Sequence, residues 1–256
     1  ARITPGWEQR FNEVQELRQK LIPLDARHEA GEELSLEEEI ERASLWGQIG
    51  RDPAQVLELW QQLLQRAPDN ARVCLALGSR LLELQDDSAC ALLARAAQLE
   101  EHFQLLVYRN LRDYYRVRQD DVNAQIWQEK LSVRAELEQN AEDERSRIQP
   151  GDQFEPHGLP EPQLAALLQQ LKQHETIRHV WLVRKTVQYL PHQPCYLLGF
   201  SCSSMLTLHT DGRANAVIEA LQRQVQFPEG TVIFCVDGDN AHFSKKMDKV
   251  AGSKLF

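Results

Sequence analysis

The segment LQDDSACALLARAAQ, residues 84–98, decides the fold of the first half of the chain, because altered copies flank it on both sides. GRDPAQVLELWQQLL (50–64) precedes it, and RQDDVNAQIWQEKLS (118–132) follows it. Three kinds of position recur at intervals of 34 residues, namely Asp52, Asp86 and Asp120; Val56, Cys90 and Ala124; and Leu63, Ala97 and Leu131. Repetition at this spacing predicts a stack of similar helical units.

A period of 34 residues is that of the tetratricopeptide repeat, a pair of antiparallel helices. In the middle repeat, we expect Gly78 on the first helix to face Cys90 and Ala94 on the second, so that the two helices approach closely. The neighbouring repeats depart from the pattern, with Ser44 and Arg112 at the usual glycine position. One well-formed repeat with degenerate neighbours predicts a tetratricopeptide-like α-solenoid.

The borders of this helical region carry recognisable capping signals. Ser35 and Glu38 have the spacing of a capping box, so a helix is expected to begin there. APDN (67–70) ends the first repeat, since proline cannot continue a helix and Asp or Asn caps the next one. Before the capping box, apolar residues at helical spacing predict an amphipathic helix within residues 1–35. The repeats and a long capping helix are expected over 36–148.

A second domain is expected over residues 149–256. It follows a stretch rich in proline and glycine, IQPGDQFEPHGLPEP (148–162), and a step in charge. Residues 1–150 hold 19 Lys and Arg against 28 Asp and Glu, whereas residues 151–256 hold 10 of each. The sequence thus predicts two domains.

The second domain contains HVWLVRKTVQYLPHQPCYLLGF (179–200), which reads as two strands around a turn. The order of its expected elements is helix, strand, strand, helix, strand, helix. The whole chain is therefore predicted to be an α + α/β two-domain protein, a tetratricopeptide-like α-solenoid followed by a small α+β sandwich. We expect a mainly antiparallel sheet with helices over one face. The pair Arg184–Lys185 within an apolar strand predicts an edge strand, with Arg184 pointing outward.

Composition limits the classes of partner and compartment. The net charge of −9 lies entirely in the first part, which argues against nucleic-acid binding. No apolar run is long enough to span a membrane, so we expect no membrane contact by this region. No signal peptide is recognisable, and the chain begins at Ala1, which suggests a piece of a longer protein. The five cysteines form no CxxC pair, and we interpret them as buried thiols of a cytoplasmic protein.

No complete catalytic motif is found in the sequence, and we assign no catalytic residue, no metal ligand and no cofactor. A zinc peptidase motif HExxH would need a second histidine after His28–Glu29 or His174–Glu175, and neither has one. Ser203 and Ser204 have no recognisable partner set. Asp237 and Asp239 follow a buried strand, where α/β proteins often bind ions or phosphate, and they are candidates for a ligand or ion. The alternative is that they form a turn.

The concave surface of the predicted solenoid is the other candidate site, because repeat proteins usually bind partners there. By repeat register, the lining residues are Arg72, Ser79, Arg109, Asp113 and Arg116. Arginines in an otherwise acidic region are suited to an acidic peptide or to another domain of the same parent protein. The alternative is that this groove only packs against the second domain.

Several segments of the chain together resemble a known family. They are FEPHGLPEPQL (154–164), VWLVRK (180–185), YLLGF (196–200), FPEGTVIFCVDGDN (227–240), SKKM (244–247) and AGSKLF (251–256), following the 34-residue repeats. The chain resembles the C-terminal half of bacterial HtpX-like zinc metallopeptidases, relatives of the CAAX prenyl proteases. The resemblance implies a membrane-associated peptidase domain with HExxH and zinc ahead of the repeats, outside this chain.

Three functions follow from these observations. The first is a non-catalytic region of such a metallopeptidase that positions substrate or a partner, which is a protein, a peptide or the peptidase domain itself. The second is a free-standing repeat adaptor that binds a peptide. The third is a small-ligand or enzymatic domain around Asp237 and Asp239.

Overall fold

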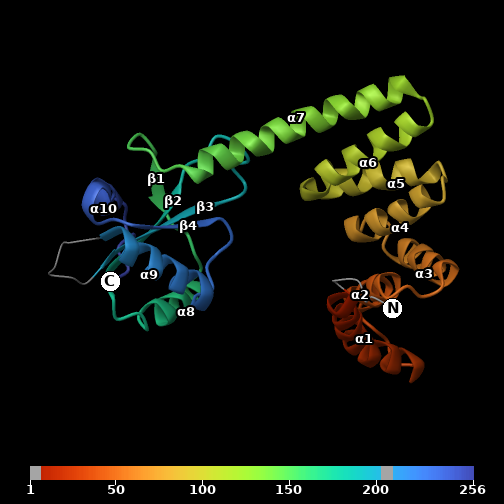
Figure 1. Cartoon of the computed structure of the whole chain (residues 1–256), viewed down its shortest axis with the longest axis horizontal. Coiled ribbons are helices and arrows are strands. Elements are labelled where there is room, and N and C mark those ends of the chain that lie inside the picture. Colours follow the sequence, from red (N-terminus) through yellow and green to blue (C-terminus); the bar gives the residue numbers. More distant parts are fainter. Residues whose placement is uncertain (1–6, 203–209) are drawn as a thin grey trace. The chain divides into compact units, whose positions relative to one another are not determined.

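The computed structural model describes residues 7–202 and 210–256, and Ser203, Ser204 and the rest of that gap lie outside the described residues. The chain divides into two compact units, one up to Ala135 and one from Glu136, and the division falls within a single helix. In chain order the main elements are α1 (Trp7–Glu29), α2 (Leu36–Gln48), α3 (Pro53–Arg66), α4 (Ala71–Glu83), α5 (Ser88–Leu99), α6 (Gln104–Val117), α7 (Asp121–Ser146), β1 (Phe154–Pro156), α8 (Glu161–Leu171), β2 (Ile177–Lys185), β3 (Cys195–Cys202), α9 (Thr210–Gln224), β4 (Thr231–Cys235) and α10 (Ala241–Met247). Figure 1 shows them coloured along the sequence.

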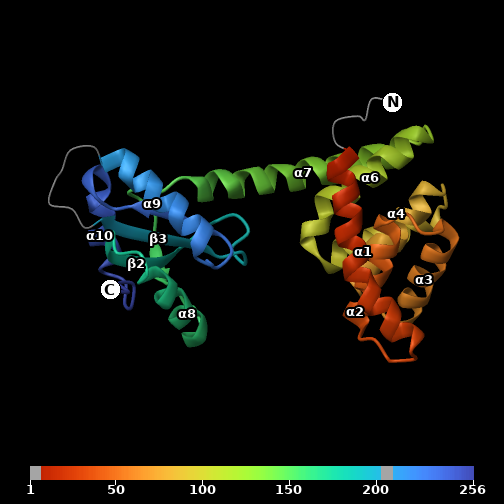
Figure 2. The same cartoon turned by 60° about the horizontal axis from the view of Figure 1, so that its bottom comes forward.

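In the first unit each helix from α1 to α6 packs on the next one along the chain. Helix α1 lies alongside α2 in both Figure 1 and Figure 2. The core of α2, α3 and α4 is centred on Ile40, Trp60 and Leu77, each at most 3% exposed. A second cluster around Leu93 and Leu111 joins α5 to α6. The predicted capping box is confirmed, because Ser35 and Glu38 exchange hydrogen bonds at the start of α2.

The 34-residue sequence repeat has a counterpart in helix capping. Asp52, Asp86 and Asp120 each accept a hydrogen bond from a backbone N–H in the first turn of the helix that follows, at 3.2, 2.9 and 3.1 Å. Gln85 and Gln119, also 34 residues apart, both have a φ of 59°, in the left-handed region. The residues conserved in spacing are therefore those that end one helix and begin the next.

The close approach expected at Gly78 is present between α4 and α5. A Cβ added to Gly78 would lie 2.9 Å from Cγ of Leu93 and 3.2 Å from its backbone nitrogen. The nearest residue is thus Leu93, rather than Cys90 or Ala94. Only glycine allows the two backbones to come this close.

The second unit contains a four-stranded sheet of the described residues, in the order β1-β2-β3-β4. The β1–β2 and β2–β3 pairs are antiparallel, but β3 and β4 are parallel. The expectation of a mainly antiparallel sheet is therefore wrong, and the sheet is mixed. Helix α9 connects β3 to β4, and such a strand–helix–strand crossover returns the second strand parallel to the first.

Helices pack on both faces of this sheet, so the prediction of helices over one face is also wrong (Figure 1). On one face, Leu171 of α8 and Leu221 of α9 pack with Leu198 and Phe200 of β3. On the other face, Phe243 and Met247 of α10 pack with Trp181, Leu197 and Phe234. The short α10 buries two large apolar residues, which its sequence of polar and basic residues did not suggest.

Strand β2 is not an edge strand, contrary to the prediction from Arg184 and Lys185. Its C-terminal half pairs with β1, which lies in the stretch predicted as a linker. Its N-terminal half pairs with the C-terminal tail, where Val180 donates to the carbonyl of Phe256 at 3.1 Å and Leu182 to that of Ser253 at 2.8 Å. These two short segments complete the hydrogen bonding of the strand.

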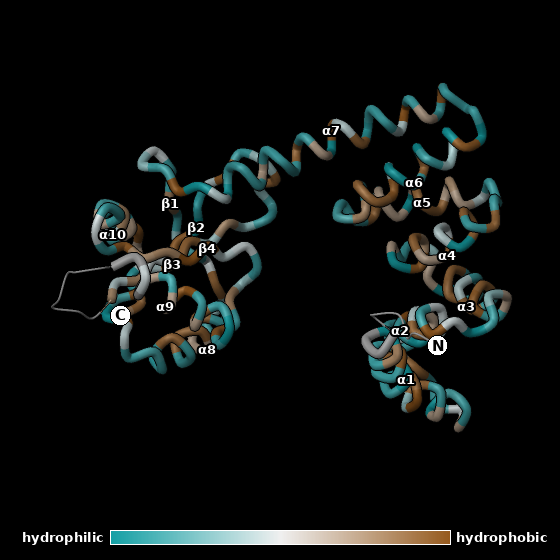
Figure 3. The backbone as a smooth tube through the Cα atoms, in the orientation of Figure 1, coloured by the Kyte–Doolittle hydropathy of each residue, from teal (hydrophilic) through white to brown (hydrophobic). Residues whose placement is uncertain are grey.

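Hydropathy differs between the elements (Figure 3). The central strands are largely apolar, whereas the long α7 is mostly hydrophilic with scattered apolar residues. Among the described helices, none combines the length and the apolar composition that crossing a bilayer requires.

Candidate functional site

The five residues predicted to line the groove lie on α4 and α6. Ser79 lines a hollow of about 280 Å³ between α2 and α4, together with Ser44, Gly47 and Arg80. Small side chains form much of this hollow, because Ala43 and Ala76 lie there too. The degenerate repeat position Ser44 thus borders the predicted groove.

Arg116 lines a second hollow, of about 440 Å³, between α6 and α7. Arg112 borders the same hollow, with Asp121 and Gln128 opposite. Since Arg109, Arg112 and Arg116 are three and four residues apart, they lie along one side of α6. Arg109 and Arg116 are exposed, and within residues 7–202 and 210–256 neither makes a salt bridge.

Arg72 and Asp113 are already engaged. Arg72 forms an exposed salt bridge with Glu37 of α2 at 2.9 Å. Asp113 accepts hydrogen bonds from Arg112 on the same helix, at 2.7 and 2.8 Å. No hydrogen bond or salt bridge among the described residues joins any two of the five predicted residues. Of the five, only Ser79 and Arg116 line a described hollow, each a different one, so the structure does not gather the five residues into one pocket.

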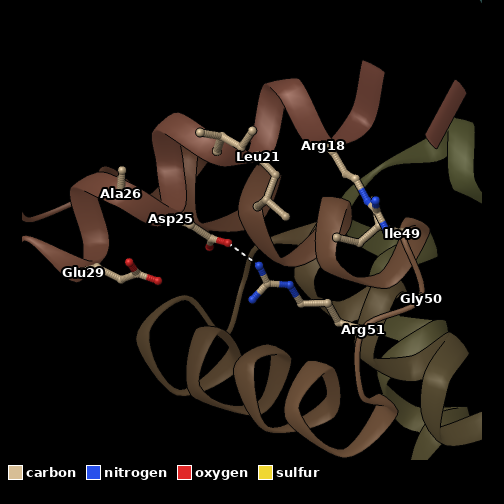
Figure 4. A pocket seen from close by; sticks show the side chains of 9 residues that line it. Arg18, Leu21, Asp25, Ala26, Glu29, Ile49, Gly50 and Arg51 are labelled. Atoms are coloured by element: carbon tan, nitrogen blue, oxygen red, sulfur yellow. Dashed lines mark hydrogen bonds and ion pairs between the residues drawn. The ribbon is translucent and has the colours of Figure 1, made fainter. Parts of the chain in front are cut away.

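A third hollow, of about 580 Å³, lies between α1 and the turn that follows α2. Sequence reasoning did not find it. In Figure 4 the Asp25 carboxylate of α1 and the Arg51 guanidinium point toward each other across this hollow, and their atoms are 2.5 Å apart. Arg18 and Glu29 lie at its rim, and Leu21 lines its apolar part.

Asp25 is the polar centre of this hollow. Its carboxylate also accepts hydrogen bonds from Arg42 at 2.8 Å and from the Trp46 indole at 3.0 Å. Burial alone would raise the pKa of Asp25, but the hydrogen bonds from Arg42 and Trp46 and the charge of Arg51 outweigh it, and the pKa lies below its ordinary value. The guanidinium groups of Arg42 and Arg51 lie 4.5 and 4.3 Å from the centre of the Trp46 ring. This cluster fixes α1 to α2, which is a structural role.

The other predicted candidates, Asp237 and Asp239, differ from each other. Asp239 is exposed, and its backbone carbonyl contacts the His242 ring at 3.0 Å. Asp237 is half-buried, and its Oδ2 accepts a hydrogen bond from the backbone N–H of Cys202 at 2.8 Å. The Cys235 thiol donates to the same oxygen at 3.5 Å. Burial is the main cause that raises the pKa of the Cys235 thiol to about 12.

Family models, curated proteins and solved structures contain no match to this chain. The likeness to HtpX-like peptidases stays a prediction from the quoted motifs.

Two lysines of the second unit, Lys185 and Lys246, bind backbone carbonyls of that unit. Lys185 is 4% exposed, and its ammonium group donates to the carbonyls of Glu144 and Arg147 at 2.7 and 2.8 Å. It also pairs with Asp152 at 2.9 Å. Lys246 donates to the carbonyl of Pro150 at 2.7 Å. These ammonium groups therefore stabilise the fold of the second unit.

Lys185 caps the C-terminal end of α7, where helix carbonyls lack partners within the helix. The same end holds the turn between β2 and β3. The Glu144 carboxylate accepts from the backbone N–H groups of Gln188 and Tyr189 at 2.8 to 3.0 Å. Arg145 donates to the carbonyl of Leu190 at 2.9 Å. The charged residues of the hairpin and of the helix end thus form one network.

The arrangement in the first unit is suited to ionic and hydrogen-bonded contacts with a partner. Exposed guanidinium groups on α6 can form paired hydrogen bonds with carboxylates. The neighbouring hollow between α6 and α7 also has the exposed Asp121 in its lining, whereas the Gln128 amide there is bonded to Arg112 and Ser132.

Proposed function

We propose that the chain is a non-catalytic protein-interaction region and that its first unit binds an acidic segment of a partner protein along α6. The observation that carries the proposal is the row Arg109, Arg112 and Arg116 on α6, of which Arg112 and Arg116 line a hollow of about 440 Å³. Two of these arginines, Arg109 and Arg116, have no salt bridge within the described parts of the chain.

The charge distribution of the first part of the chain supports an acidic partner. The first 150 residues carry nine more acidic than basic side chains, as 28 Asp and Glu face 19 Lys and Arg. An exposed row of arginines in this setting is a local exception, and it favours an acidic ligand over a basic one. Because exposed ionic contacts are weakened by salt, the affinity should fall as ionic strength rises.

The helical unit supports a tetratricopeptide-like mode of binding. Its caps at Asp52, Asp86 and Asp120 repeat with the period of that motif, and its helices pack in chain order. In such repeats the first helix of each pair lines the binding surface. By this register α6 contributes the first helix of the third pair.

The wider assignment rests on sequence motifs. We place the chain as the repeat-plus-α/β region of an HtpX-like zinc metallopeptidase, with substrate or the peptidase domain as the partner. Zinc and HExxH belong in this proposal to a peptidase domain outside the chain. A free-standing adaptor that uses the same surface of α6 is the second candidate, and the sequence repeat favours it equally.

A binding experiment tests the surface on α6. Fluorescence anisotropy of a fluorescein-labelled oligo-glutamate peptide, with oligo-lysine as the sign control, is measured against the chain at low salt. We expect saturable binding of oligo-glutamate only. Arg109→Glu with Arg116→Glu should weaken it at least tenfold.

The matched control changes the charge equally in the other unit. Arg223→Glu with Lys245→Glu alters two exposed basic residues of α9 and α10. This variant should bind as the unchanged chain does. Equal weakening by both double variants would assign the binding to net charge and would overturn the role of α6.

A cleavage assay tests the non-catalytic assignment. The purified chain is incubated with labelled casein, with and without Zn²⁺ and with a chelator. No cleavage is expected. Chelator-sensitive cleavage would overturn the proposal, whereas zinc binding without cleavage would not.

A further inference from the structure

Two cysteines and an aspartate gather where the parallel strands β3 and β4 end. Cys202 is the last residue of β3, Cys235 is the last residue of β4, and Asp237 follows two residues later. One ligand atom from each, two Sγ and one carboxylate oxygen, all lie within 4.8 Å of one another. All three residues are half-buried. In open α/β sheets, ligands bind beyond the carboxyl ends of parallel strands.

We propose that Cys202, Cys235 and Asp237 form a binding site for one soft divalent cation of the zinc class. The site lies in the second unit and is independent of the partner surface proposed on α6. It departs from the interpretation of the cysteines as buried thiols without ligands, because two of the five have their thiols close together beside a carboxylate.

The distances suit tetrahedral coordination. Zinc binds thiolate sulfur at about 2.3 Å and carboxylate oxygen at about 2.1 Å, which places such an S and O about 3.6 Å apart in a tetrahedron. The Cys235 Sγ and the Asp237 Oδ2 are 3.5 Å apart. Two thiolates in a tetrahedron lie about 3.8 Å apart. With all three atoms within 4.8 Å, Cys202 needs at most a small movement of its side chain.

The surroundings of the carboxylate also suit a metal ligand. The backbone N–H of Cys202 donates to Asp237 Oδ2 at 2.8 Å and so fixes the orientation of the carboxylate. Hydrogen bonds of this kind commonly hold the ligands of metal sites. The N–H belongs to the last residue of β3, so the same segment supplies both a ligand and its support.

The ligand set indicates the class of metal. Two thiolates select soft or borderline cations such as Zn²⁺, Co²⁺ and Cd²⁺ over Mg²⁺ and Ca²⁺, which prefer oxygen ligands. Binding replaces the two S–H bonds with two metal–sulfur bonds and releases two protons to solvent. Three protein ligands leave one tetrahedral position for water or another ligand.

Cobalt spectroscopy tests the site. The chain, reduced and stripped of metal, is titrated with Co²⁺ alone. We expect one equivalent to produce a thiolate-to-cobalt charge-transfer band and the strong visible bands of a tetrahedral site, and Zn²⁺ should displace it. Cys202→Ser and Cys235→Ser each leave one thiolate, so each should reduce the charge-transfer band of the bound ion to about half or weaken binding by at least 100-fold. This exceeds the ~10–100-fold typical of losing an outer-shell partner.

Two further variants keep the result interpretable. Asp237→Asn retains an oxygen that can accept the Cys202 N–H, and it should weaken Co²⁺ binding by at least tenfold while circular dichroism stays unchanged. Cys90→Ser removes a half-buried thiol of the first unit and should leave the spectra unchanged. A chain that shows no charge-transfer band with excess Co²⁺ would overturn the proposal. A band that persists in Cys202→Ser with Cys235→Ser would also overturn it.

Discussion

Two sets of basic residues, one in each unit, are used in opposite ways. In the second unit, Lys185 and Lys246 donate to backbone carbonyls, and Arg184 pairs with Glu155 across β1 and β2 at 2.6 Å. In the first unit, Arg109 and Arg116 lie exposed on α6 without a salt bridge among the described residues. Residue type alone therefore does not distinguish a structural cation from one that is available to a partner.

The two sets of basic residues differ in whether unpaired backbone carbonyls lie nearby. Helix α7 ends in a charged segment, and its last carbonyls have no partners within the helix. Lys185 satisfies two carbonyls at this end from the neighbouring strand. By contrast, α6 ends in a turn whose own N–H groups reach back, because Arg118 and Gln119 donate to the carbonyls of Tyr114 and Arg116. Its arginines are thus not required for capping.

The largest loss of stability is expected from a substitution at Lys185. Lys185→Ala removes a cation that is 4% exposed, together with its ion pair to Asp152 and its hydrogen bonds to two carbonyls. Breaking a buried ion pair from one side costs about 3–5 kcal/mol. We expect the second unit to lose stability by about this amount, measured by hydrogen exchange of the amides of β2 and β3.

The neighbouring residue is the control. Arg184 and Glu155 are 44% and 41% exposed, and ion pairs this exposed contribute little to stability because water screens them. Arg184→Ala should therefore leave the exchange of β3 almost unchanged. Similar losses of stability in Lys185→Ala and Arg184→Ala would show that the buried ion pair and hydrogen bonds of Lys185 do not specially stabilise the second unit.

A smaller effect is expected within the first unit, at Gly78. Gly78→Ala places a methyl group 2.9 Å from the Leu93 side chain and 3.2 Å from its backbone nitrogen. Overpacking of this kind costs about 1–3 kcal/mol, while the gain in helix propensity returns about 1. We expect a net loss of about 0–2 kcal/mol in a denaturant titration followed by tryptophan fluorescence.

Gly47 on α2 is the matched control. A Cβ there would also be close to a neighbour, at 2.7 Å, but that neighbour is the end of the Arg80 side chain. The Arg80 side chain is 40% exposed and can move aside. Gly47→Ala should leave stability unchanged or raise it by up to about 1 kcal/mol. An equal loss at both glycines would contradict the close α4–α5 approach as the special feature.

Much of the helical unit could be predicted because its signals are local. The caps at Ser35 and Asn70 depend on side chains within three residues of the N–H groups they bind, so short sequence patterns contain them. The sheet was harder to predict, because pairing joins distant segments. The parallel β3–β4 pair follows from the helix between the strands, since a strand–helix–strand connection returns the second strand parallel to the first. Nothing local marks the pairing of the C-terminal tail with β2.

The candidate sites were predicted less completely than the fold. Repeat register predicts which side of α6 carries Arg116, because that position follows from helical spacing, and a hollow lies beside Arg116 in the structure. The partners of Arg72 and Asp113 depend on side-chain reach across or along helices, which the spacing does not specify. The position of Asp237 after a buried strand marks it as a ligand candidate in the sequence. Its proximity to Cys202 and Cys235 depends on the pairing of two strands distant in the chain, which no local pattern specifies.

The last comparison concerns Asp25, whose buried ion pair with Arg42 in the first unit is similar to that of Lys185 with Asp152 in the second. Its pKa lies below the ordinary value of 3.8, so the carboxylate stabilises the folded state when ionised. That contribution is present above the ordinary pKa and is lost as the pH falls through the lowered pKa of the folded state. Asp25→Asn should therefore be less stable than the unchanged chain at pH 7, and the gap should close in strong acid. Thermal unfolding at pH 7 and in strong acid measures this difference in stability.

Glu29→Gln, on the exposed rim of the same hollow, is the control and should differ little in stability from the unchanged chain at either pH. If the loss of stability in Asp25→Asn stayed constant down to the lowest pH, Asp25 would contribute by its shape and hydrogen bonds rather than by its charge. The ion pairs of Asp25 would then not stabilise the contact between α1 and α2.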